Sequence, residues 1–137
     1  MMELPLPYLK EIASQLIFIS AFLGGFSAAV LGTLIISKSD KKTLKYLILG
    51  TALSSTAFIV SVMSLTKLVM IALPGYPFEV SSSDTLFPRL VGVFAFFIGI
   101  MASMFVISAS GWMHSKRLGI LTTIIGLIGT VFIFISM

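Results

Sequence analysis

The sequence predicts an all-α integral membrane protein: a compact, left-handed, antiparallel bundle of four transmembrane helices in one domain, residues 1–137. Hydrophobic residues make up 58% of the chain and charged residues only 10%, and the mean hydropathy is +1.14. Four apolar runs each reach the roughly 20 residues with which a helix crosses a bilayer, whereas strands of a membrane barrel would alternate over about ten residues. The expected spans cover residues 12–36, 43–72, 86–110 and 118–136.

Each run also carries one stripe of mostly small residues, three or four positions apart. Because lipid tails compete with apolar side chains, membrane helices associate through close backbone approach at small residues. An average spacing of about 3.5 residues predicts left-handed crossing. In the first run the stripe consists of Ser14, Phe18, Ala21, Gly25, Ala28 and Gly32. The glycines expected at helix contacts are Gly25, Gly32, Gly50, Gly92, Gly99, Gly119, Gly126 and Gly129.

Prolines and polar turns predict where the first two helices begin and end. Residues 4–7, Leu-Pro-Leu-Pro, favour an extended approach to the first helix. The apolar run behind them is about twice as long as the core of a signal peptide, which argues against cleavage. The second helix, at about 30 residues, would be roughly 45 Å long and should tilt or project beyond the bilayer. Pro-Gly-Tyr-Pro at 74–77 ends it.

The third helix is expected to begin at a polar cap and to be rich in phenylalanine. Ser83 or Asp84 is the expected cap, and Pro88 is tolerated in the first turn. Four phenylalanines lie mostly off the small stripe and are expected to face lipid or another subunit: Phe94, Phe96, Phe97 and Phe105. The fourth helix ends almost at the C-terminus.

The charges predict an orientation in the membrane. The turns at 38–45 and 114–117 are basic, whereas the connection at 74–88 holds Glu79 and Asp84. Short basic loops stay in the cytoplasm, so the connection at 74–88 and both termini are expected outside. The net charge of +4 then serves orientation and contact with anionic lipid, not nucleic-acid binding. The two basic hairpins indicate either an internal duplication or simply the alternation of any multi-pass topology.

Extending the stripes outward leads to three charged residues, Glu11, Lys67 and Arg89. All three fall near the outer end of the predicted bundle and are expected to point inward, forming a gate or an anion site. Gln15, one turn from Glu11, is a further polar candidate. Alternatively, Lys67 and Arg89 extend their alkyl stems along the bundle and reach the lipid headgroups.

The second helix is the richest in hydroxyl groups. Ser54, Ser61 and Ser64 lie on its small stripe and could line a narrow hydrated path, because hydroxyls replace part of the water shell of an ion. Alternatively, each serine bonds to its own helix and serves only as a small packing residue.

Catalytic, metal and cofactor sites are not expected. The chain has no cysteine and one histidine, His114, without a nearby carboxylate, so a metal site is not predicted. The carboxylate nearest to a span, Glu11, lies at the membrane edge, which disfavours proton-coupled transport. Residues 20–26 resemble the start of the pore helix of Orai calcium channels, but the acidic residue of that helix would fall near Thr33. No functional residue is therefore transferred from the resemblance.

The sequence predicts a protein that acts through assembly in the lipid bilayer. A tightly packed bundle leaves little space for a solute inside one copy, so a homo-oligomeric passive pore for ions or small solutes is the first expectation. An accessory or scaffold subunit bound to another membrane protein is the alternative, and a membrane-embedded enzyme is a distant one.

Overall fold

The computed structural model describes residues 5–39, 41–77 and 81–136, which are helical apart from short turns. The elements in chain order are α1 (Leu6–Ile36), α2 (Lys42–Ile71), α3 (Ser82–Ser110), the short 3₁₀ helix η1 (Gly111–Met113) and α4 (Lys116–Ser136). In the described ranges, four helices are long and apolar enough to cross a membrane, as the sequence predicts. Leu4 and Glu79 lie outside the described residues.

Two of the predicted helix starts are wrong. α1 begins at Leu6, directly after Pro5, and contains Pro7 in its first turn. A proline is tolerated there because the N–H that it lacks would have no partner in the first turn of a helix. The expected extended approach is therefore wrong for Leu6 and Pro7, whereas Pro5 itself has extended backbone angles, φ −55° and ψ 135°. The cap of α3 is Ser81: its backbone N–H donates to Asp84 Oδ2 at 3.1 Å, and its hydroxyl faces the N–H of Asp84 in a capping box. Ser83 and Asp84 lie inside the helix.

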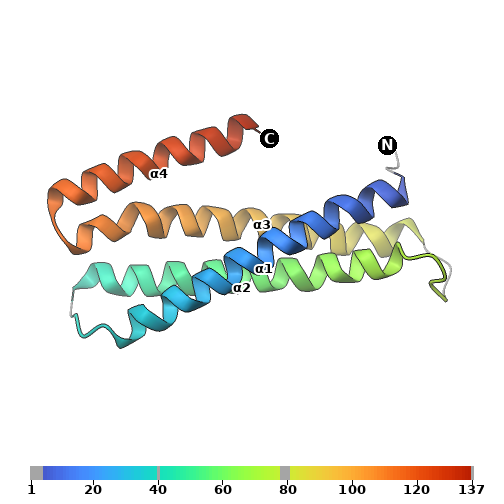
Figure 1. Ribbon diagram of the computed structural model, residues 1–137, viewed down its shortest axis with the longest axis horizontal. Coiled ribbons are helices and arrows are strands. Elements are labelled where there is room, and N and C mark those ends of the chain that lie inside the picture. Colours follow the sequence, from blue (N-terminus) through green and yellow to red (C-terminus); the bar gives the residue numbers. More distant parts are fainter. Residues whose placement is uncertain (1–4, 40, 78–80, 137) are drawn as a thin grey trace.

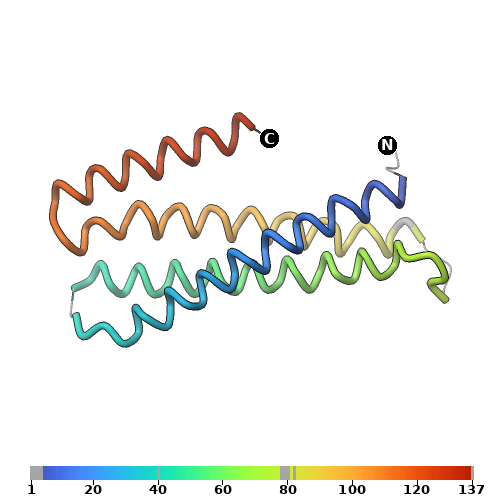
Figure 2. Tube along the Cα trace, in the orientation of Figure 1, coloured from blue at the N-terminus to red at the C-terminus, as the bar shows by residue number. Residues whose placement is uncertain are grey.

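The helices form an open arrangement and not the compact bundle that the stripes predict (Figure 1). α2 packs extensively against both α1 and α3, and among the described elements α4 packs only against α3 and η1. Within the described ranges, α1 and α4 make no contact with each other, and Figure 2 shows how α4 diverges from the other helices. For helices that span a bilayer, an open arrangement is physically acceptable. Lipid tails are as apolar as leucine side chains, so an apolar helix face need not be covered by another helix.

The predicted stripes of α2, α3 and α4 do lie at helix contacts. A Cβ built on Gly50 would lie 2.9 Å from Val106, and one built on Gly92 would lie 2.7 Å from Leu65. On α4, Gly119 lies against Trp112, Gly126 against Ser108 and Gly129 against Met104. Close backbone approach at small residues therefore holds α2 to α3 and α3 to α4.

The stripe of α1 lies one position earlier than predicted. The buried residues of α1 are Ala13, Ser20, Gly24 and Ser27, whereas Gly25 and Gly32 are exposed and have no atom within 4 Å of an added Cβ. A shift of one residue rotates the contact face by about 100°. The expectation that Gly25 and Gly32 hold α1 inside a single chain is therefore wrong, and the small residues of this second stripe face outward.

The phenylalanines of α3 divide between core and surface. Phe96 is buried, and its ring meets Phe58 of α2 edge-on, with centroids 6.2 Å apart. Phe94 and Phe105 are exposed, as expected. The expectation of an outward face is thus wrong for Phe96, which lies on the same side of α3 as Gly92 and Gly99.

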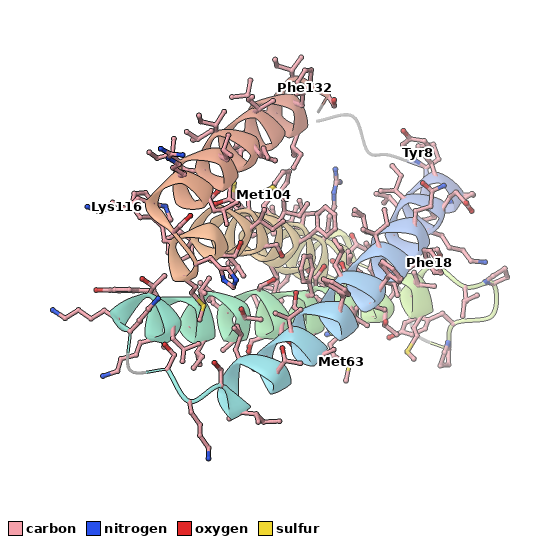
Figure 3. All side chains as sticks on the ribbon, turned by 60° about the vertical axis from the view of Figure 1, so that its left-hand side comes forward. Tyr8, Phe18, Met63, Met104, Lys116 and Phe132 are labelled. Atoms are coloured by element: carbon pink, nitrogen blue, oxygen red, sulfur yellow. The ribbon has the colours of Figure 1, made fainter. Side chains whose placement is uncertain are left out.

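The two basic turns lie at the same end of the molecule (Figure 1). Lys41 Nζ donates to the main-chain oxygen of Met113 at 2.7 Å and so joins the turn before α2 to the turn after α3. Lys116 projects from this end in Figure 3. The connection between α2 and α3 lies at the opposite end.

Candidate functional site

Glu11 and Gln15 lie on the face of α1 that points away from α2. Both are exposed, and Gln15 Nε2 donates to Glu11 Oε1 at 3.3 Å. Two residues correspond to about 200° around a helix, so Glu11 and Gln15 lie almost opposite the buried Ala13 that separates them. The two polar groups form one exposed pair at the beginning of α1.

Lys67 and Arg89 do not join that pair. Lys67 is exposed beside the buried Leu68 at the end of α2. Arg89 borders a cavity of about 140 Å³ between α1, α2 and α3, whose other lining residues include Ala13 and Leu65. Within the described residues, no ion pair connects Glu11, Lys67 and Arg89. A gate or anion site formed by the three charges therefore stays a prediction.

The serines of α2 instead form hydrogen bonds between helices. Ser20 Oγ donates to Ser61 Oγ at 3.2 Å, and Ser27 Oγ lies 3.2 Å from Ser54 Oγ. Ser54 Oγ also lies 2.7 Å from Ser103 Oγ, which donates to the main-chain oxygen of Gly99 at 3.0 Å. A chain of three hydroxyls thus crosses from α1 through α2 to α3.

These serines are buried at helix contacts. Ser61 has 0% and Ser54 1% of its surface exposed, and Ser64 is half-buried. Ser55 adds a further bond, from Oγ to the main-chain oxygen of Gly24 at 3.4 Å. Within one chain, Ser54 and Ser61 hold helices together through these hydrogen bonds, and a hydrated path along Ser54, Ser61 and Ser64 stays a prediction.

Ser20, Ser27 and Ser103 were not predicted from the sequence as contact residues. For Ser20 and Ser27, the sequence does contain a pattern that indicates their role. Ser20 and Ser27 are seven residues apart, and so are their partners Ser61 and Ser54. Equal spacing keeps both pairs in register when two helices run antiparallel. A search for matching heptads of serine would have paired α1 with α2 on the correct face.

A half-open cavity of about 290 Å³ is lined by residues of all four long helices. The hydroxyl-bearing residues Ser27, Thr51, Ser54 and Ser103 form one part of its lining. The remaining lining is apolar and comes from α1, α3 and α4: Leu23, Phe26, Val30, Ile100, Met104, Val106, Ile107 and Ile133. The cavity is therefore an apolar chamber with a hydroxyl patch.

A second cavity of about 290 Å³ lies on the outside, between α1 and α2. The outward stripe of α1 contributes Ala21, Gly25 and Ala28, and α2 contributes Ile59 and Met63. Figure 3 shows Phe18 and Met63 on the two helices that flank this outer groove. The groove has a floor of small residues and an apolar wall.

A metal centre is not formed by the described residues, since no three His, Asp or Glu side chains gather there. His114 is exposed in the turn after η1. No protein-family model, curated protein or solved structure matches this chain.

Proposed function

We propose that the protein assembles into a homo-oligomer in a lipid bilayer and forms a passive pore for ions or small solutes between its copies. The observation that carries the proposal is the outer groove, whose floor is the unpartnered stripe of α1 around Gly25 and Ala28. Small residues that face outward allow a helix of a neighbouring copy to approach closely. Each copy would supply α1 as the wall of a shared lumen.

The polar groups of α1 support this role. The face opposite α2 begins with Glu11 and Gln15 and includes Thr33 farther along, all of them exposed. A ring of such side chains at the pore mouth would replace part of the hydration shell of an ion. The serines inside one copy are bonded to one another, so a lumen between copies fits the structure better than a path within one copy.

Passive flow fits the placement of ionisable groups. In α1 no charged residue follows Glu11 before Lys38, and in α2 none lies between Lys45 and Lys67. Proton coupling needs an ionisable group inside the membrane path. A pore without such a group conducts down a gradient.

The proposed orientation places the joined basic turns at 38–45 and 114–117 in the cytoplasm, with both termini and the connection at 74–88 outside. The bond between Lys41 and Met113 supports it, because it keeps the two basic segments on one side. The heptad spacing of the serine pairs supports left-handed crossing of α1 and α2.

The test combines subunit number in nanodiscs with ion flux into liposomes. Wild type is expected to form one defined oligomer and to dissipate an imposed ion gradient. Replacing Gly25 and Ala28 by Leu should yield folded monomers without flux, because the new side chains fill the outer groove. Thr56→Leu, on the exposed face of α2, is the matched control and should retain both properties. A monomeric wild type without flux would refute the pore.

An accessory subunit is the second candidate, and a cavity of about 480 Å³ on the opposite side of α2 favours it. Tyr46 and Leu53 of α2 and Phe94, Met101 and Phe105 of α3 contribute to its lining. Such an exposed aromatic surface suits the helix of another membrane protein. A defined oligomer that conducts no ion under any imposed gradient would favour this role over the pore.

A further inference from the structure

We propose that the cavity between α1, α2, α3 and α4 binds one neutral hydrocarbon alcohol that enters laterally from the bilayer. The proposal is independent of the pore, because it depends only on the hydroxyl chain and on the separation of α4 from α1. The cavity, at about 290 Å³, is close to the lower end of pockets that hold small molecules.

The hydroxyl chain ends at one main-chain oxygen. Ser103 Oγ donates to the main-chain oxygen of Gly99, one turn back on its own helix, and Ser54 Oγ donates to the same oxygen at 3.2 Å. In the contacts of Ser54 with Ser103 and with Ser27, either hydroxyl can be the donor. Each hydroxyl has one proton and two lone pairs, so Ser27, at the far end of the chain, can both donate and accept.

The end of this chain, Ser27, lines the cavity. Ser27 has only 8% of its surface exposed, and Ser54 is its hydrogen-bond partner among the described residues. Thr51 is similar: 2% is exposed, and its hydroxyl proton goes to the main-chain oxygen of Leu47 at 2.7 Å. The cavity is therefore lined by hydroxyl oxygens that can accept a further hydrogen bond.

These properties select the chemistry of the occupant. A ligand with an O–H group can donate to Ser27 and accept from it in turn, whereas an alkane can do neither. Of the residues that line the cavity, none is charged, so a carboxylate or a phosphate head would be buried without a counter-ion. A hydrocarbon chain matches the apolar walls formed by Met104, Ile107 and Ile133.

Access from the bilayer follows from the open fold. In the part of the chain that the structure describes, α4 contacts α3 and η1 but not α1, so the cavity is not closed by a helix contact on that side. Val30 of α1 and Ile133 of α4 both border the cavity. A chain that enters between them would meet the hydroxyl patch with its head group and leave its tail toward lipid.

The test uses purified wild-type protein in nanodiscs and n-decanol with a photoreactive diazirine at its tail. Wild type should be labelled saturably at about one probe per chain, on peptides from residues 23–30, 100–107 or 133. Unlabelled n-decanol should compete at least about fivefold better than n-decane or ionised decanoate. Equal competition by the three compounds, or labelling that does not saturate, would overturn the proposal without any variant.

Three variants sharpen the result. Ile133→Trp fills the cavity and should abolish saturable labelling, whereas Phe134→Trp, on the exposed face of α4, should label as wild type does. Ser27→Ala should remove the preference for decanol over decane while the alkane still competes. Wild-type labelling in Ile133→Trp, or an unchanged preference in Ser27→Ala, would refute the assignment.

Discussion

The ring of Phe58 on α2 lies directly against Gly99 of α3: a Cβ built on Gly99 would lie 2.8 Å from Cε1 of that ring. On the other side of α2, a Cβ on Gly24 of α1 would lie 3.0 Å from Cβ of Phe58. Phe58 has 0% of its surface exposed. One aromatic side chain thus fills the space that two glycines on two different helices leave open, and the contact of α1, α2 and α3 centres on it.

Gly99→Ala should destabilise the fold by about 1–3 kcal/mol, because the added methyl group overpacks the contact with Phe58. Equilibrium unfolding in mixed micelles, followed by circular dichroism, measures the free energy of unfolding. Gly25→Ala is the control, since nothing lies within 4 Å of its new Cβ. Equal stability of the two variants would contradict the packing role of Gly99.

Ser54→Ala should also lower the free energy of unfolding. Hydrogen bonds between membrane helices contribute about 0.6 kcal/mol on average and about 1.7 kcal/mol at most, and Ser54 contacts Ser27 and Ser103. We therefore expect a loss of about 1–2 kcal/mol, and a double-mutant cycle with Ser103→Ala should show positive coupling. Ser64→Ala, at a half-buried serine on the same helix, should cost less. A cycle without coupling would argue that packing alone holds these helices.

The number, type and approximate limits of the helices could be predicted from the sequence, because hydropathy and proline act locally. The contact face of α1 could not, because this helix carries two stripes of small residues offset by one position. Composition favours neither stripe, and the serine pairs Ser20–Ser61 and Ser27–Ser54 determine which one meets α2. Such pairs depend on two helices at once, so they are invisible to a reading of one helix at a time.

The candidate site was harder to predict for a related reason. The stripe of α1 that does not meet α2 led to Glu11, which lies away from α2, and the predicted cluster with Lys67 and Arg89 has no ion pair among the described residues. Ser54 was identified from its helix face, but its partner Ser103 was not. The cavity depends on the separation of α4 from α1. The glycines of α4 predict that this helix contacts a neighbour, but they do not predict which of the other helices it contacts.

Gly119→Val should displace Trp112, whose ring lies against Gly119 and whose Nε1 donates to Thr123 Oγ1 at 3.1 Å. Trp112 is the single tryptophan, so its emission reports this contact without interference. We expect a shifted emission maximum and at least about twofold faster quenching by acrylamide. The conservative control is Ile120→Val at an exposed position of α4. Emission identical to wild type in Gly119→Val would show that α4 does not depend on this contact.

Single cysteines should reveal the orientation in the membrane, because the chain has no cysteine of its own. Ser39→Cys lies beside the basic turn before α2, and Ser83→Cys lies at the opposite end, in the first turn of α3. Basic turns stay in the cytoplasm, so an impermeant maleimide should label Ser83→Cys in intact cells and Ser39→Cys only after permeabilisation. Ser115→Cys should behave like Ser39→Cys, since the bond from Lys41 to Met113 holds the two turns together. Labelling of Ser39→Cys and Ser115→Cys in intact cells, with Ser83→Cys protected, would reverse the proposed orientation.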